Sequence, residues 1–150
     1  MTDPNWQALK AVTVPAKTAQ GFWTLALGYI AGPSRLRFVV EKTVDAPSQP
    51  PVLNEWICAP NRTCTADGDP KLPINPANCL FPEAPPGALI AKIGGSIAGK
   101  KDGKLFVVGS YCIVDLDETA KGALFLAMNA DPMSSLTRDG QLLVGISQSN

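Results

Sequence analysis

The chain has 150 residues, of which thirteen are basic and thirteen acidic, so its formal net charge is zero. This length suits one domain that buries its own core, and the charge balance excludes the strongly basic surface that nucleic-acid binding requires. The chain contains no histidine, which removes the usual general base of serine and cysteine hydrolases and the commonest zinc ligand.

Short strands are expected along most of the chain, because fourteen prolines and thirteen glycines interrupt it. Alternation of apolar and polar residues supports this expectation, as where Leu36, Phe38 and Val40 share one face. Only the segments 5–10 and 117–121 could support a helical turn or two. In chain order, strands are expected at 12–14, 22–27 with 29–30, 35–40, 53–57, 87–93, 105–108, 111–116, 122–128 and 140–146.

Residues 45–86 form an expected long loop region, because ten prolines disfavour both helix and central strand there. Three cysteines of this region offer a staple, with Cys58–Cys64 and Cys64–Cys79 as alternative disulfides. The fourth, Cys112, lies in an apolar run that suits a buried free thiol. A zinc site is disfavoured, since the chain lacks histidine and any Cys-x-x-Cys motif.

The last third of the chain contains three apolar runs that each open on a glycine, at 87–94, 122–128 and 140–146. Runs of this length, bounded by turn residues, are typical of strands. The cadence predicts an all-β fold, an antiparallel β-sandwich of jelly-roll type, that occupies residues 1–150 as a single domain. The glycine-rich stretch 94–103 lacks the spacing of a phosphate-binding loop, so it is interpreted as a connection between strands.

On these three runs, the opening strands, Trp23-Thr24 and Gly32-Pro33, the chain resembles the PA-I galactophilic lectins of bacteria and their galactose-binding-like relatives. The resemblance covers nearly the whole chain through short hydrophobic motifs. It implies a galactose-binding-domain-like sandwich that binds galactose-type sugars and catalyses no reaction. It also implies a Ca²⁺ ion held by loop oxygens, since this ion prefers hard oxygen ligands that sugar hydroxyls can complete.

The family resemblance places the site in the polar loop 129–139, together with the loop at 45–54. Its calcium pattern is altered here, because Ala130 follows the asparagine where the family has an aspartate, and Arg138 replaces an asparagine. Two alternatives remain: a slipped loop that forms a different cation shell, or a plain turn followed by a strand entry. The candidate sugar-binding residues are Trp56, Asn129 and Asp131, and the candidate metal ligands are Asp131, Ser134, Thr137 and Asp139.

A carbohydrate is therefore the expected partner, and the family resemblance is compatible with a homo-oligomer. The N-terminal residues show no signal-peptide pattern and no stretch reaches the length of a membrane span, so we expect a soluble protein, cytoplasmic or secreted without a recognisable signal peptide.

Two other functional interpretations are open. The first is a β-sandwich interaction or assembly module that has lost the calcium and sugar site. The second is an enzyme that uses Asp67, Asp69, Asp115 or Asp117, but no two of these carboxylates stand at a recognisable catalytic spacing. We therefore assign no catalytic residue.

Overall fold

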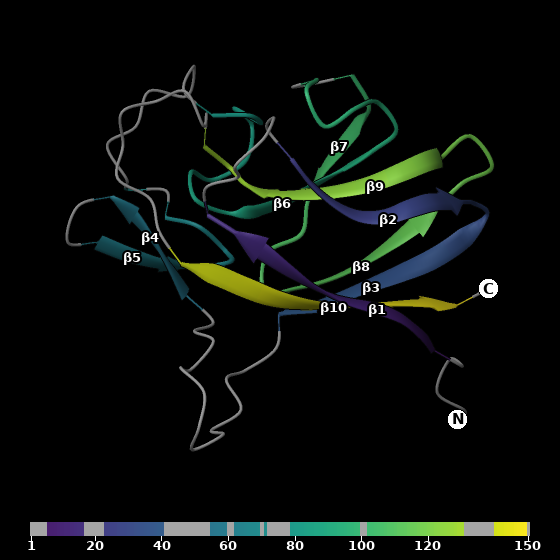
Figure 1. Ribbon diagram of the computed structural model, residues 1–150, viewed down its shortest axis with the longest axis horizontal. Helices are drawn as coiled ribbons and strands as arrows, with labels where there is room; N and C mark the ends of the chain where they lie inside the picture. The colour runs from purple at the N-terminus through teal and green to yellow at the C-terminus, as the bar shows by residue number, and fades with distance from the viewer. Residues whose placement is uncertain are drawn as a thin grey trace.

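The structure is a computed structural model that describes residues 6–16, 23–40, 55–59, 62–69, 71, 79–99, 102–130 and 140–149, with the backbone alone at 55–59 and 62–63. The described residues form strands and no helix (Figure 1). The strands are β1 (Gln7–Pro15), β2 (Thr24–Ala31), β3 (Ser34–Val40), β4 (Glu55–Ala59), β5 (Arg62–Thr65), β6 (Leu89–Ile93), β7 (Lys104–Val107), β8 (Tyr111–Leu116), β9 (Lys121–Met128) and β10 (Gln141–Ser149).

Two four-stranded sheets lie face to face, as the sequence predicted (Figure 1). Sheet A has the strand order β1-β10-β3-β8, and sheet B has the order β2-β9-β6-β7. All pairs within them are antiparallel, and β4 and β5 form a separate two-stranded hairpin. The expected antiparallel β-sandwich is therefore confirmed.

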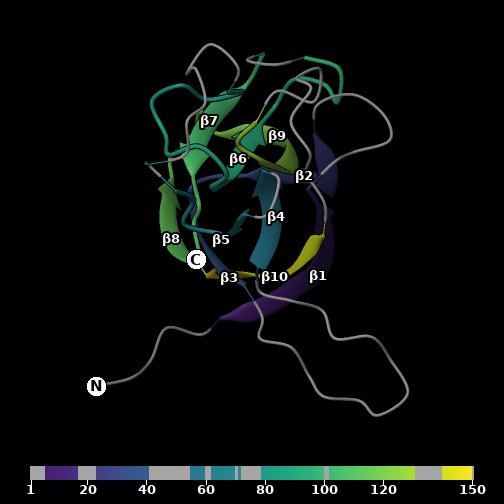
Figure 2. The same ribbon diagram turned by 90° about the vertical axis from the view of Figure 1, so that its left-hand side faces the viewer.

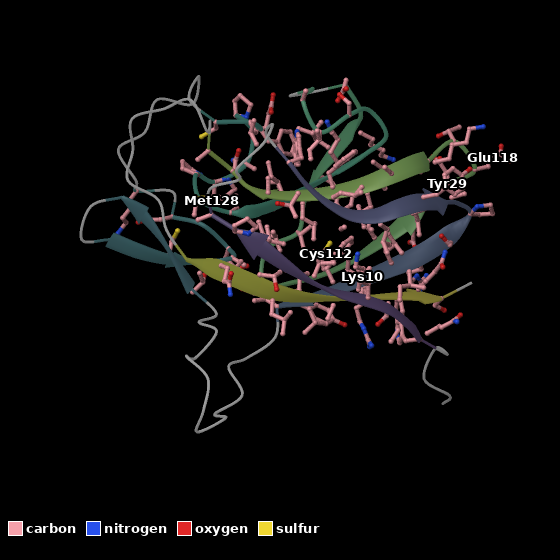
Figure 3. The ribbon with its side chains drawn as sticks, viewed as in Figure 1. Lys10, Tyr29, Cys112, Glu118 and Met128 are labelled. Atoms are coloured by element: carbon pink, nitrogen blue, oxygen red, sulfur yellow. The ribbon has the colours of Figure 1, made fainter. Side chains whose placement is uncertain are left out.

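The main core lies between the two sheets, because alternate residues of each strand point inward. On β3, Leu36 and Phe38 are fully buried while Arg35 is exposed, as the alternation predicted. The facing residues of sheet B include Leu124 and Leu126, which belong to the same buried cluster. Partly buried Cys112 of β8 packs against this cluster, and Figure 3 shows its sulfur between the two layers.

The middle of sheet B is buried on its outer face as well. A second apolar cluster combines Ile90 and Phe125 from the sheet with Trp23 and with Leu80 from the segment that precedes β6. Every residue of β6 is buried for this reason. A strand covered on both faces has a nearly continuous apolar sequence, which explains why apolar and polar residues hardly alternate at 87–93.

The segments that lead to the predicted site loops leave one end of the sandwich, which we call the loop end. In sheet A, Pro15 at the end of β1 pairs with Gln141 at the start of β10. In sheet B, Met128 at the end of β9 pairs with Leu89 at the start of β6. Figure 2 looks onto this end, and Figure 3 places Met128 there, with Glu118 at the opposite end.

Three local predictions were wrong. The segment expected as a helical turn at 5–10 is largely strand, because Gln7 to Lys10 pair with β10. The other expected helical turn, at 117–121, is a tight turn that leads into β9. Strand β5 was not foreseen, since only 53–57 looked able to form a strand in the proline-rich region. The described part of the chain contains no helix with the length and hydrophobicity that a membrane crossing needs.

Candidate functional site

The described residues that precede the two predicted site loops, Val40 and Ala130, lie at the loop end. The 131–139 segment leaves sheet B after Ala130 and re-enters sheet A at Gly140. Gly140 is held there, since its carbonyl accepts a 2.9 Å hydrogen bond from the amide of Ala16. The segment after β3 also starts at this end, because Val40 pairs with Val144 near the beginning of β10. The described bases of the two loops therefore lie on one end of one sandwich.

Asn129 is the described candidate residue at this end, and its side chain is fully buried. Its Oδ1 accepts a 2.8 Å hydrogen bond from the amide of Phe81. Its Nδ2 donates to three backbone carbonyls, those of Phe81 at 2.9 Å, Ala84 at 3.1 Å and Pro85 at 3.0 Å. The amide therefore ties the 81–85 segment to the end of β9.

The backbone of Asn129 is held as firmly as its side chain. Its N–H donates to the carbonyl of Ala88 at 2.7 Å, and its C=O accepts from the amide of Gly87 at 3.0 Å. A side-chain amide offers two donor hydrogens and one acceptor oxygen, so both donors are engaged with the protein. A ligand that approached Asn129 would find only the remaining lone pair of Oδ1, in a buried position.

The other candidate residues lie outside what the structure describes in side-chain detail. Asp131, Ser134, Thr137 and Asp139 belong to 131–139, which is outside the described residues. Trp56 is described by its backbone alone, in β4, where it pairs with Cys64 of β5. Their roles in binding sugar or calcium stay predictions.

The described residues at the loop end do not by themselves fit a calcium ion. Ala130 is buried and offers no side-chain oxygen, and the donors of Asn129 are engaged by backbone carbonyls. Across the part of the chain that the structure describes, no group of three or more acidic, cysteine or histidine side chains gathers to hold a metal. A calcium shell would therefore need ligands from outside the described residues, such as those of 131–139.

A comparison with protein-family models found no match to this chain, and a search of curated proteins found no similar sequence. The assignment of a function therefore depends on the chain's own residues and on the resemblance of its sequence motifs.

A second polar cluster was not foreseen from the sequence. Lys92 points out of the middle of β6 and its side chain is fully buried. Its Nζ donates three hydrogen bonds of 2.6 Å, to the carbonyls of Ser96 and Gly99 and to Oδ1 of Asp102. Three acceptors match the three hydrogens of an ammonium group, so the buried charge is fully satisfied.

Aromatic rings complete the environment of Lys92. Its Nζ lies 5.0 Å from the ring centroid of Trp23 and 4.9 Å from that of Phe125, within the range of a cation–π contact. Trp23 also donates from Nε1 to the carbonyl of Gly99 at 2.9 Å. The described residues of the 94–103 connection thus fold back onto the outer face of sheet B. The connection joins β6 to β7, as the sequence predicted.

Asp102 closes the same connection from its other side. Its Oδ2 accepts hydrogen bonds from the amide of Ser96 at 2.8 Å and from the Ser96 hydroxyl at 3.1 Å. The hydrogen bond from Lys92 lowers the pKa of Asp102 below its ordinary value, and the Ser96 amide acts in the same direction. This carboxylate therefore remains ionised to lower pH in the folded protein than in the unfolded chain.

The acidic residues that the sequence offered as catalytic candidates each have a different partner. Asp67 accepts hydrogen bonds from the amide and the hydroxyl of Ser110, both at 2.9 Å, and Asp69 accepts one from the amide of Lys71 at 2.9 Å. Asp115 forms a 2.6 Å ion pair with Arg35, and Asp117 accepts hydrogen bonds from Thr119. These carboxylates stabilise turns and neighbouring strands in the described structure.

The described cysteines exclude one of the two disulfides that the sequence left open. Cys79 carries a free thiol, so the Cys64–Cys79 disulfide is not formed in this structure. The side chain of Cys58 lies outside the described residues, and the Cys58–Cys64 alternative stays a prediction. Cys112 is free, as expected, and burial raises the pKa of both Cys79 and Cys112.

Proposed function

We propose that this protein is a non-enzymatic carbohydrate-binding protein whose binding surface is the loop end of the sandwich. The observation that carries the proposal is the convergence there of the bases of both expected binding loops, next to Asn129, which is anchored on its backbone and side chain alike. Binding residues are commonly found on loops that a rigid scaffold positions. The resemblance to galactophilic lectins supports a galactose-type sugar.

The chemistry of such a ligand suits the residues available at this end. A sugar is uncharged and presents many hydroxyls, so it is held by side-chain oxygens and amides together with aromatic rings that cover its apolar faces. Asp131 supplies a carboxylate immediately after the anchored Ala130, and Trp56 is the aromatic candidate from β4. Calcium, held by oxygens of 131–139, is the proposed cofactor.

The proposal is tested by screening the purified protein on a glycan array, with calcium and again with a chelator. We expect binding of galactose-type sugars, and a loss of binding in Asp131→Ala. Asp115→Ala is the matched control, because that carboxylate pairs with Arg35 on β3, away from the expected binding loops. If the wild-type protein binds no sugar in either condition, the lectin hypothesis is abandoned.

A second candidate function is an interaction module without a calcium or sugar site. It is favoured by Ala130, which has no ligand oxygen, and by the engagement of the Asn129 amide with the backbone. Calorimetric titration with Ca²⁺ separates the two candidates. Heat of binding that disappears in Asp131→Ala supports the calcium-assisted lectin, whereas a silent titration together with an empty glycan array supports the interaction module.

A further inference from the structure

The four edge strands of the two sheets differ in how they are protected against pairing with another chain. An edge strand presents unpaired N–H and C=O groups, and proteins usually blunt it with bulges, lysine, proline or very short length. The edge strands here are β1 and β8 in sheet A, and β2 and β7 in sheet B.

Three of these edges carry recognisable protection. Strand β1 has a register shift between Ala8 and Lys10, exposes Lys10 and ends at Pro15. Strand β2 has two register shifts in its pairing with β9. Strand β7 has only four residues and begins with the exposed Lys104.

Strand β8 has neither a bulge nor a lysine nor a proline, and its one charged residue, Asp115, is paired with Arg35 of β3. Its six residues, Tyr111 to Leu116, pair with β3 without a register shift and include no proline, glycine or lysine. Its exposed face presents two large side chains, Tyr111 and Ile113, with 58% and 45% of their surface accessible. Figure 2 shows β8 at the outer border of its sheet, and within the described residues it pairs along one side only.

The register with β3 determines which backbone groups face outward. The amide of Val40 donates to the carbonyl of Ser110 at 3.0 Å, on either side of the pair Val39–Tyr111. In an antiparallel ladder this identifies Val39–Tyr111 as a pair that does not exchange hydrogen bonds. The N–H and C=O groups of Tyr111, Ile113 and Asp115 therefore point toward the open edge.

We infer that this edge pairs, antiparallel, with β8 of a second copy of the chain, about a twofold axis at Ile113. In that register Ile113 faces its own copy and Tyr111 faces Asp115 of the other chain, on the exposed face. The outward groups of these three residues then exchange six backbone hydrogen bonds. A twofold contact requires a self-complementary surface, and this alternation of tyrosine, isoleucine and aspartate provides one.

Charge favours the same register. The charged residue of β8 is Asp115, and in this arrangement its two copies lie four residues apart along the strands, roughly 14 Å at about 3.4 Å per residue. Arg37 on β3 is kept from its copy by three strand spacings, again about 14 Å, which exceeds the Debye length of about 8 Å at physiological salt. An axis at Asp115 would place two carboxylates directly opposite each other, which is destabilising.

The first test measures oligomeric state by sedimentation over a wide range of protein concentration. We expect the wild-type mass to rise from that of one chain toward that of two, and Ile113→Lys to fold and remain a monomer, because residue 113 is exposed. The matched control is Tyr29→Lys, another exposed large hydrophobic residue on an edge strand, which keeps the wild-type behaviour (Figure 3). A wild-type protein that stays monomeric, or an Ile113→Lys variant that dimerises like wild type, overturns the inference.

The second test measures the register with a short thiol crosslinker. Ile113→Cys places two thiols on paired residues whose Cα atoms lie about 5.5 Å apart, whereas the two copies of Tyr111→Cys lie roughly 14 Å apart. We expect covalent dimers from Ile113→Cys and only the wild-type background from Tyr111→Cys. Native Cys112 is the neighbouring thiol that could crosslink in the wild-type protein, but its side chain faces the core. Crosslinking of Tyr111→Cys in place of Ile113→Cys would refute the axis at Ile113. The readout does not depend on sugar binding, so it separates this inference from the proposed lectin function.

Discussion

Replacing Asn129 by aspartate is the sharpest perturbation of the loop end, because the two side chains have nearly the same shape. The change removes both donor hydrogens of Nδ2 and puts an oxygen in their place. That oxygen then faces the carbonyls of Phe81, Ala84 and Pro85, which lie 2.9 to 3.1 Å from the nitrogen it replaces. We expect a large, pH-dependent loss of stability.

The magnitude follows from the hydrogen bonds. Both hydrogens of Nδ2, which serve three carbonyls, are lost in a fully buried site. The carbonyls of Phe81 and Pro85 keep the amides of Ala84 and Ala88 as donors, so the groups left without a partner are the new carboxylate oxygen and the carbonyl of Ala84. At about 1–3 kcal/mol for each such group, we expect a loss of about 2–6 kcal/mol at neutral pH. Three facing carbonyls also raise the pKa of the new carboxyl above the ordinary aspartate value of about 3.9. The folded variant therefore binds a proton more readily than its unfolded chain, and its stability relative to wild type rises as pH falls.

The assay is urea-induced unfolding followed by tryptophan fluorescence, for which the fully buried Trp23 provides an internal probe. Wild type and Asn129→Asp are compared at neutral pH and at mildly acidic pH, where a protonated carboxyl donates one hydrogen bond again and the loss shrinks to about 1–3 kcal/mol. Gln7→Glu is the matched control, since this exposed position makes the same amide-to-acid change in solvent. A loss below about 1 kcal/mol at neutral pH, or a loss that does not change with pH, would refute the anchoring role of Asn129.

Other predictions concern the two connections that flank β6. Lys92→Met should lower the free energy of unfolding by about 1–3 kcal/mol, because the carbonyls of Ser96 and Gly99 each lose a charged donor, whereas the 41%-exposed Asp102 can be hydrated instead. A chemical denaturation curve that shows no change in stability would contradict this prediction. Since folding lowers the pKa of Asp102, the stability that this carboxylate provides is present above the ordinary carboxyl pKa and is lost as pH falls through the pKa of the folded state. Asp102→Asn should therefore make the free energy of unfolding depend less on pH in the acid range, and a pH dependence equal to that of wild type would argue against this role of Asp102. Gly68→Ala should lower the free energy of unfolding by about 1–3 kcal/mol, because Gly68 has a φ of 78° and a Cβ there would lie 2.7 Å from the backbone oxygen of Pro86. A melting temperature equal to that of wild type would contradict the tight packing of this turn.

Local pattern predicted the architecture well where a strand has one solvated face. Strand β8 was predicted with its observed bounds, and its residues alternate between exposed positions and half-buried or buried ones. The beginning of β1 was mistaken for a helical turn, because Gln7 to Lys10 have no strong strand preference of their own. Their conformation is imposed by pairing with β10, which lies more than a hundred residues away in the chain.

The candidate site was harder to predict, because the partners of its polar groups come from distant segments. Asn129 was selected as a sugar ligand from its place in a polar loop, whereas its observed partners lie in the 81–85 segment. Lys92 gave a weak signal, a single lysine within an otherwise apolar run. Its significance depends on Ser96, Gly99 and Asp102, whose backbone and side-chain oxygens gather around it only once the 94–103 connection folds back.

The direction of β8 determines where the two loop ends of a dimer would face. Tyr111, its first residue, lies at the loop end of the sandwich, since it pairs with Val39. Antiparallel association through β8 would therefore send the loop ends of the two copies in opposite directions. Such a bivalent particle would bridge two separate glycan-bearing surfaces rather than gain avidity on a single one, because both ends cannot face the same surface.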